Sequence, residues 1–480
     1  MPERFFSRLA PTSVSDPRLL LWNDPLAREL GLGDAVGDET ELALLFSGNR
    51  LSMDAKPIAM VYAGHQFGQF VPCLGDGRAI LLGELIDQNG RRRDLQLKGS
   101  GRTPYSRRGD GRAWLGPVLR EYLISEAMHA LGIPTTRALA VVTTGEPVFR
   151  EEGAMPGAIL TRVASSHIRI GTFEYFARTQ DLDGLRRLAD YVLMRHYPDL
   201  LEADEPYLAL LQAITANQAR LIAQWLGVGF IHGVMNTDNM AISGETIDYG
   251  PCAFMDEYHP STVFSFIDQG GRYAFGNQPR IAAWNLARLA EALLPMMDDD
   301  PRRSLVKGQE VIAGFQQLFE DAWLSRMTAK LGLASVREGD AGLIGELLNI
   351  MEVGRADYTL TFRGLADLAT DANAAVLVAR RFTKPAPFLA WVERWRTRLM
   401  VEGRSGAEVY QGMRRVNPAL IPRNHRVEEA LVAAVQEGDL APFLRLHRRL
   451  ADPFSDHPES TALANLPAMH ERIEHTFCGT

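Results

Sequence analysis

Residues 232–248 contain side chains whose types and spacing could bind a divalent cation and move a proton. Asn239 and Asp248 offer an amide oxygen and a carboxylate oxygen, separated by a short stretch of chain. Magnesium prefers a few such hard oxygen ligands, completed by phosphate oxygens and water. Asp238 is the only carboxylate residue between positions 229 and 244, which makes it the candidate general base. A base must first reach the proton that it accepts, and only then does its pKa matter.

These residues follow the order of the catalytic and metal loops of protein kinases, with one part missing. His232 and Asn239 are spaced as in the kinase motif H-R-D-L-x-x-x-N, and Asp248-Tyr249-Gly250 takes the place of D-F-G. Val234 occupies the position of the kinase base, and a valine cannot accept a proton. His232 is interpreted as a structural histidine that braces the loop. The pattern favours ATP chemistry other than ordinary phosphorylation.

A lysine and a helix glutamate upstream of these loops could hold the phosphates of a nucleotide. Residues 94–101 alternate polar and apolar side chains, which predicts a strand, and Lys98 lies late in it. Only five of the 51 basic residues are lysines, so a lysine in this position stands out. Helical periodicity over 115–131 places Glu121 where a kinase has its lysine-holding carboxylate, with Glu126 as the second choice. A surface lysine and an unrelated glutamate stay open as the alternative.

Two glycine turns could bring backbone N–H groups close to phosphates, because no Cβ stands in the way. The first, G-D-G-R-A, contains Gly75, Gly77 and Arg78, and the second, R-R-G-D-G-R, contains Asp110 and Gly111. A hairpin turn with a surface arginine and a solvated loop are the ordinary alternatives for these two segments.

Two arginines follow in the same part of the chain. Arg162 ends an expected strand, and Arg169 lies seven residues beyond it. Guanidinium groups can neutralise a triphosphate through bidentate hydrogen bonds. Ordinary salt bridges explain the same spacing, so the two arginines alone do not decide the question.

Strand and helix patterns alternate in the first third of the chain, and later patterns are mostly helical. Strands are expected over 74–86, 94–101, 137–144 and 157–163, with a helix over 115–131 and turns at 89–90 and 145–147. Later helices are expected over 183–196, 206–226, 280–295, 301–331, 341–352, 385–400 and 426–450. This order predicts an α+β, protein-kinase-like two-lobed fold with a small mixed N-lobe, a mainly helical C-lobe and a helical C-terminal extension. The expected boundaries are 1–55 for an N-terminal wrap, 56–173 for the N-lobe, 174–370 for the C-lobe with the catalytic and metal loops, and 371–480 for the extension.

The composition of the 480 residues is that of an ordinary globular protein, with 46% apolar and 23% charged residues. A net charge of −8 argues against nucleic acid as the main partner. No apolar run approaches the roughly 18 residues of a transmembrane helix, so no membrane partner is expected. Three cysteines are too few for a disulfide framework, and a reducing cytoplasm is the expected location.

The combined motifs resemble the selenoprotein O family of protein adenylyltransferases over nearly the whole chain. The resemblance rests on Y-A-G-H-Q-F-G (62–68), L-G-D-G-R-A (74–79), L-K-G-S-G-R-T-P-Y-S-R (97–107), G-D-G-R-A (109–113), S-E-A-M-H-A-L-G-I-P-T-T-R-A-L (125–139), H-G-V-M-N-T-D-N-M (232–240), D-Y-G-P (248–251) and V-N-P-A-L-I-P-R-N (416–424). Several of these strings are long and unusual, so the resemblance is specific.

The resemblance implies a kinase-like fold that binds ATP inverted relative to kinases and transfers AMP to Ser, Thr or Tyr hydroxyls of proteins. It implies nucleotide contacts from Gly75, Gly77, Arg78, Lys98, Asp110, Gly111, Arg162, Arg169 and Asp248. It further implies Glu121 as the partner of Lys98, Asp238 as proton acceptor, and Asn239 with Asp248 as ligands of Mg²⁺ or Mn²⁺. The family also suggests redox-related protein targets and automodification, which no residue of this chain tests.

Redox control is a point where the chain departs from its relatives. Eukaryotic members of the family have selenocysteine near the C-terminus, and Cys478 lies at the matching place. Residues 261–268, where some bacterial members have a second cysteine, contain none, so a regulatory disulfide to that site is doubtful. Cys252 is interpreted as a small buried apolar residue. A silent nucleotide-binding pseudokinase and a phosphotransferase with Asp238 as base remain the alternative functions.

Overall fold

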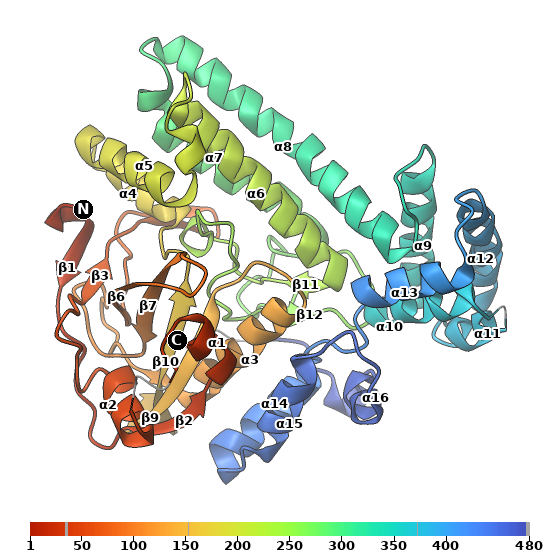
Figure 1. The fold of residues 1–480 in the computed structure, drawn as a ribbon, viewed down its shortest axis with the longest axis horizontal. Helices are drawn as coiled ribbons and strands as arrows, with labels where there is room; N and C mark the ends of the chain where they lie inside the picture. Colours follow the sequence, from red (N-terminus) through yellow and green to blue (C-terminus); the bar gives the residue numbers. More distant parts are fainter. Residues whose placement is uncertain (34–36, 152, 372, 477–480) are drawn as a thin grey trace.

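The computed structural model describes residues 1–33, 37–151, 153–371 and 373–476 and has a mixed α+β fold (Figure 1). Its main sheet is antiparallel and lies in the first third of the chain. The strands in spatial order are β1 (Phe6–Arg8), β3 (Ile58–Met60), β6 (Ala79–Ile86), β7 (Arg92–Lys98), β10 (Gly153–Ala164), β9 (Arg137–Arg150) and β2 (Arg18–Trp22), with β8 (Ala113–Trp114) paired to β10. Residues from the expected N-terminal wrap therefore form both edge strands of this sheet.

Helices cover both faces of the central strands because successive strand residues point to opposite sides. On one face, Leu139 and Val142 of β9 pack against α1 (Asp24–Glu29) and α2 (Glu39–Ser47). On the other face, Val141 and Leu160 join the core formed with α3 (Leu115–Ala130). The strand pattern of the sequence thus places α3, with Glu121, directly behind the strand that contains Arg162.

Two smaller strand pairs lie outside the main sheet. β4 (Gly64–Gln66) and β5 (Gln69–Val71) form a short hairpin, and β11 (Phe230–Ile231) pairs with β12 (Ala253–Phe254). The second pair lies on either side of the expected catalytic and metal loops, so it brings the two loops together.

The rest of the chain is helical. The helices are α4 (Ile170–Arg178), α5 (Leu182–His196), α6 (Pro206–Val228), α7 (Gln278–Met297), α8 (Pro301–Lys330), α9 (Asp340–Gly354), α10 (Tyr358–Leu365), α11 (Ala374–Ala379), α12 (Pro385–Met400), α13 (Gly406–Val416), α14 (Asn424–Val432), α15 (Ala441–Leu450) and α16 (Pro458–Ala464). The long helices α6, α7 and α8 pack together, and α9 to α13 form a separate group at one end of α8 (Figure 1). Within the described residues, no helix combines the length and apolar character needed to cross a membrane.

Helix ends follow ordinary capping chemistry. Pro206 starts α6, where its missing N–H costs nothing, and Gly229 ends it with φ 77° and an N–H that donates to the Leu226 carbonyl. The helices expected over 206–226 and 301–331 are confirmed within two residues at each end.

Two sequence expectations about these elements are wrong. The turn at 145–147 does not form, because β9 runs through it to Arg150. Gly145 takes φ 72° within a bulge of β9, where residues 144–146 lie opposite the single residue Gly157 of β10. The single helix expected over 426–450 is broken, with a π-turn at Ala433–Glu437 and a left-handed Gly438 (φ 70°) between α14 and α15.

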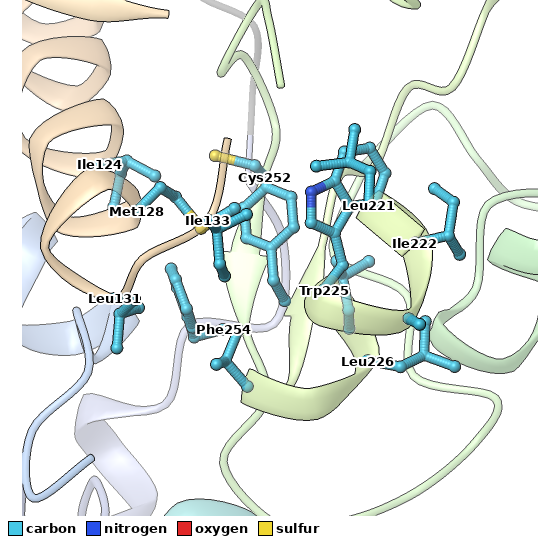
Figure 2. Close-up of a cluster of buried hydrophobic side chains, with 14 of the residues drawn as sticks. Ile124, Met128, Leu131, Ile133, Leu221, Ile222, Trp225, Leu226, Cys252 and Phe254 are labelled. Atoms are coloured by element: carbon cyan, nitrogen blue, oxygen red, sulfur yellow. The ribbon is translucent and has the colours of Figure 1, made fainter. Parts of the chain in front are cut away.

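A buried apolar cluster joins the sheet region to the helical region (Figure 2). Side chains of α3, including Met128, meet side chains of α6, including Trp225, across Cys252 and Phe254. Cys252 is fully buried there, as expected. The Trp225 indole N–H also donates to the Thr246 hydroxyl at 2.9 Å, which anchors the loop that leads to Asp248.

The C-terminal helices return to the outer side of α3. Tyr122 contacts the rings of Phe443 and His447 in α15, with centroids 6.4 and 5.4 Å apart. Arg120 donates to Glu428 of α14 at 2.7 Å and to the Cys252 carbonyl at 2.6 Å. The helix that contains Glu121 is thus held on its inner and outer faces.

Candidate active site

Five charged residues from separate elements, three of them buried and two half-buried, meet where the sheet faces the helical region. We call them the pocket cluster: Lys98, Glu121, Arg162, Arg169 and Asp248. Lys98 ends β7, and Arg162 lies on the neighbouring strand β10, which pairs with β7 in antiparallel register. Glu121 comes from α3, Arg169 precedes α4, and Asp248 lies on the loop before β12.

Within the pocket cluster, two carboxylates are shared among three cations. Lys98 Nζ lies 2.5 Å from Glu121 Oε2 and 3.2 Å from Asp248 Oδ1. Arg162 Nη2 donates to Glu121 Oε1 and to Asp248 Oδ1, both at 2.6 Å. Arg169 Nη1 donates to Asp248 Oδ2 and, at 2.5 Å, to the Asp238 carbonyl. Both carboxylates therefore lie between cations.

The cations decide the ionisation of the two carboxylates. Burial opposes the charge on Asp248, but Arg169, Arg162 and Lys98 outweigh it and hold the pKa of Asp248 well below its usual range. Burial likewise opposes ionisation of Glu121, and Arg162 with Lys98 lowers the pKa of that carboxyl. Burial lowers the pKa of Lys98, and the Glu121 carboxylate opposes this effect. With both carboxylates ionised and Lys98 protonated, the cluster has one positive charge in excess. A buried excess cation favours an anionic ligand.

Asp238 lies beside the pocket cluster without a cation on its carboxylate. Asp238 forms part of the short 3₁₀ turn Thr237–Asn239 and is 6% exposed. Oδ2 accepts a hydrogen bond from Gln66 Nε2 at 3.2 Å, while Oδ1 is buried with no partner in the described structure. Burial raises the pKa of Asp238 to about 6, against the lowering effects of Arg169 and Gln66. A carboxyl of this kind can exchange a proton near neutral pH.

Asn239 and Asp248 fit the donor set of a magnesium or manganese ion. Asn239 donates its amide N–H to the Val234 carbonyl at 3.0 Å, so the N–H side of the amide is fixed and its oxygen is a candidate ligand. Asp248 is ionised and adopts φ 64°, a left-handed conformation that few residues other than glycine take. Strain of this kind clusters at functional sites. Among the described residues, no group of three or more His, Cys, Asp and Glu side chains is placed to hold a metal ion.

His232 braces the same loop, as expected. Its ring is completely buried, and Nε2 lies 2.9 Å from the Ile247 carbonyl, next to Asp248. Its backbone N–H donates to the Gln278 side chain at 3.0 Å.

The first glycine turn lies at the edge of the pocket cluster. The Arg78 carbonyl accepts a hydrogen bond from the Gly99 N–H at 2.7 Å, so the turn is fixed next to Lys98. A Cβ on Gly75 would lie 2.4 Å from Tyr105 Cγ, and one on Gly77 would lie 3.0 Å from the Tyr105 carbonyl. The packing of the following loop therefore already requires glycine at both positions.

The second glycine turn lies farther out. Asp110 is 46% exposed and binds Arg150 at 2.8 Å, and it has no recorded contact with the pocket cluster in the described part of the chain. Gly111 has φ 71°, and a Cβ there would lie 2.2 Å from the backbone of Gly101. The structure thus brings together the predicted residues of the pocket cluster and Asp238, but leaves Asp110 at the rim.

Sequence reasoning missed one buried carboxyl near the site. Asp76, between the two glycines of the first turn, accepts from the Met60 N–H at 3.0 Å and from Gln96 at 3.3 Å, and its Oδ1 has no partner among the described residues. Burial raises the pKa of Asp76 to about 6. Gln96 also contacts Arg162 at 3.5 Å, so Asp76 is linked to the cluster through one side chain. The letters G-D-G-R contained this aspartate, but nothing in them indicated burial.

Two further residues of the Y-A-G-H-Q-F-G string also contact the site. The Tyr62 ring lies under the Arg169 guanidinium at 4.8 Å, and Gln66 binds Asp238. The string itself was the available signal, although it gave no role to either residue.

The end of the described chain lies against the metal loop. Thr476 donates its backbone N–H to the Phe264 carbonyl at 2.7 Å and its hydroxyl to the Pro251 carbonyl at 2.6 Å. Cys478 lies outside the described residues, so its suggested redox role stays a prediction.

Comparison with known proteins places the chain in a family. A family model described as protein adenylyltransferase SelO matches residues 1–451. A protein nucleotidyltransferase YdiU of Rhizobium leguminosarum bv. trifolii is 58% identical over 480 residues, covering 100% of this chain and 96% of the relative. Relatives of the same name from Bradyrhizobium sp. and Methylorubrum populi are 57% and 56% identical, covering 100% of this chain and 97% of each relative. The chain belongs to the SelO family of protein adenylyltransferases.

Proposed function

We propose that this protein transfers AMP from ATP to Ser, Thr or Tyr hydroxyls of other proteins. The acceptor oxygen forms a bond to the α-phosphorus, the bond from that phosphorus to the bridging oxygen breaks, and pyrophosphate leaves. The hydroxyl proton passes to Asp238. The observation that supports this best is a pocket cluster with an excess cation beside a carboxyl, Asp238, that no cation neutralises.

The chain's own cations would stabilise the charge that develops on the phosphates. Arg162 and Arg169 are 1% and 3% exposed, so they act in a site from which water is largely excluded. Electrostatic stabilisation is strongest in such an environment. Glu121 fixes Lys98, and Asp248 fixes both arginines, until phosphate oxygens take up some of these donors.

Asn239 and Asp248 would hold Mg²⁺ or Mn²⁺ against the phosphates. The ion supplies further neutralisation of phosphate charge when bound. For Asp248 to become a ligand, the phosphates must draw Arg162 and Arg169 toward themselves, because both now occupy the Asp248 oxygens. Cation and nucleotide binding should therefore be strongly coupled.

We further propose that ATP lies with its terminal phosphates deep in the pocket, inverted relative to a kinase. The buried Arg162 and Arg169 suit the phosphate end, whereas Asp110 and Gly111 at the rim suit the outer part of the nucleotide. Gly75, Gly77 and Arg78 would line the path between these two regions.

We propose that the chain has the two-lobed arrangement of a protein kinase. The sheet with α3 corresponds to the N-lobe (56–173), with 1–55 wrapped on it. Residues 174–370 correspond to the C-lobe and 371–480 to the extension. Redox-related target proteins and automodification remain part of the proposal, as does a cytoplasmic location.

Two labels on ATP test the proposal. The purified protein is incubated with a protein mixture and Mg²⁺ or Mn²⁺, using ATP labelled at the α-phosphate and, in parallel, at the γ-phosphate. Protein-bound α-label without γ-label is expected, and it should be lost in Lys98→Ala. Bound γ-label would instead identify a phosphotransferase, and ATP binding without any transfer would identify a silent pseudokinase.

A further inference from the structure

The proposed chemistry assigns no role to the hairpin β4–β5, which begins within the Y-A-G-H-Q-F-G string. It stands apart from the main sheet and lies on the turn that contains Asp238. A short two-stranded hairpin is at best marginally stable alone, so its position depends on contacts with its surroundings.

Backbone groups of the hairpin bind the two residues that precede Asp238. The His65 N–H donates to the Thr237 hydroxyl at 2.7 Å. The Phe67 N–H donates to the Asn236 side-chain oxygen at 3.0 Å, and Tyr273 donates its hydroxyl to the same oxygen at 2.7 Å. The hairpin and the catalytic loop are therefore fixed to each other on both sides of Gln66.

A buried glutamate strengthens this attachment. Glu174 of α4 accepts a hydrogen bond from the Thr237 hydroxyl with one oxygen and contacts His65 Nδ1 with the other. Its side chain is 5% exposed. The hairpin, the catalytic loop and α4 thus share one hydrogen-bonded junction.

Gln66 uses this fixed position to contact the candidate base. Its Nε2 donates to Asp238 Oδ2 at 3.2 Å, and this is the one side-chain hydrogen bond that the Asp238 carboxylate receives from the described residues. Gly64 packs against the other oxygen so closely that a Cβ there would lie 2.3 Å from Oδ1. The rotation of the carboxylate is therefore set by an amide on one side and by a glycine on the other.

We propose that Gln66 is a positioning residue for adenylyl transfer, whose amide orients the Asp238 carboxylate while the hairpin Gly64–Val71 holds that amide in place. The inference rests on the proposed function, since it assigns Gln66 a part in that reaction. Gln66 has no recorded contact with the pocket cluster in the described structure, so its effect falls on transfer and not on ATP binding.

The hairpin offers a matched control for Gln66. Gln69 is its cross-strand partner, is exposed, and has a side chain with no hydrogen bond to another described residue. Gln66→Leu and Gln69→Leu make the same chemical change on the same hairpin, but only the first removes the donor to Asp238. Loss of a hydrogen bond to a charged group changes an equilibrium constant or a rate constant by roughly ten- to a hundredfold.

The experiment measures transfer of α-labelled AMP at saturating ATP, together with ATP affinity by titration calorimetry, for the full chain and both variants. Gln66→Leu should lower the maximal rate by about ten- to a hundredfold with an unchanged ATP Kd, and Gln69→Leu should match the unchanged chain. Equal rates for the two variants would overturn the inference, and so would a loss of ATP affinity as large as the loss of rate.

Folding is checked by thermal melting, and Gln66→Asn is the second variant if Gln66→Leu melts early. Asparagine keeps the amide but withdraws it by one methylene, so a folded Gln66→Asn should also lose rate without losing ATP affinity, and full activity would contradict the inference. If the unchanged chain and Gln69→Leu transfer no label at all, the proposed function fails and this inference fails with it. A loss confined to the Gln66 variants supports both.

Discussion

A second ion cluster, centred on the fully buried Arg423, has the opposite balance of charge. We call it the latch: Arg423, Asp256 and Asp357. Arg423 Nη1 lies 2.7 Å from Asp256 and Nη2 lies 2.5 Å from Asp357. Its Nε donates to the Ala464 carbonyl at 3.1 Å. All three nitrogens of this guanidinium therefore have a protein acceptor.

In the pocket cluster, by contrast, the cations are not all paired with protein acceptors. It has three cations for two ionised carboxylates, and Arg169 Nε is buried without a partner among the described residues. Arg423 belongs to a string that carries the family resemblance, V-N-P-A-L-I-P-R-N, whereas Arg169 was singled out only by its spacing from Arg162. The difference teaches that a buried ion pair does not itself mark a site: the latch binds its arginine completely, whereas the pocket cluster has more cations than carboxylates and lies beside Asp238.

Of the substitutions predicted here, one that breaks the latch should have the largest effect, and this effect should be on the stability of the fold. Arg423→Met leaves the buried Asp357 and the half-buried Asp256 without their cation, so the free energy of unfolding should fall by about 3–5 kcal/mol. Urea unfolding measures this, and α-label transfer per folded molecule should stay near that of the unchanged chain. Lost transfer with intact stability would place the latch in the active site.

An arginine-to-methionine substitution in the pocket cluster should instead affect transfer more than stability. Arg169→Met removes a proposed donor to the phosphates, so transfer should fall by about 10²–10³-fold. Stability should change less than in Arg423→Met, because Lys98 and Arg162 still hold Asp248. The two variants are compared in parallel by label transfer and urea unfolding, and equal destabilisation in both would remove the distinction drawn above.

Asp76→Asn tests how much folding stability is lost when a buried carboxyl that no cation contacts directly becomes ionised. The pKa of Asp76 rises from 3.8 to about 6 on folding, so its ionisation in the folded state lowers stability as pH rises through that range. Asparagine has no such penalty, and the variant should be more stable by about 3 kcal/mol at pH 8 and by about half of that at pH 5. Urea unfolding at both pH values checks this, and a gain that does not depend on pH would refute the assignment.

The pH dependence of transfer should show the smallest effect. Asp238 accepts a proton only when ionised, and its pKa is about 6. Transfer should therefore reach a plateau near pH 8 and be about tenfold slower at pH 5. Initial rates of α-label transfer at saturating ATP measure this, with ATP binding followed at each pH. A flat profile across that range would exclude Asp238 as the base.

Sequence reasoning singled out the residues that the structure brings together in the pocket cluster, mostly through motifs of fixed spacing. The offsets from His232 to Asn239 and Asp248, and the strand that ends at Lys98, depend on local chain geometry. Helix ends were found where proline and glycine have a fixed meaning, as in α6. Roles at the site remain predictions, since geometry brings residues together without showing what they bind.

The sequence could not reveal features that depend on tertiary packing. Gly145 suits a turn, yet it lies within β9, because a bulge in that strand accommodates its left-handed backbone. Burial of Asp76 and Asp238 depends on segments distant in sequence, such as the hairpin β4–β5 over Asp238. Helical periodicity continued across Gly438, where the chain in fact turns between α14 and α15.

The most direct test of the account is to identify the product that leaves ATP while a protein acceptor is modified. The purified chain, with Arg169→Met and Arg423→Met beside it, is incubated with ATP, Mg²⁺ and the acceptor mixture, and released pyrophosphate and ADP are quantified against bound label. One pyrophosphate should be released for each AMP bound, and this release should be lost in Arg169→Met and retained by folded Arg423→Met. Release of ADP in step with acceptor labelling, or transfer that survives Arg169→Met, would contradict it.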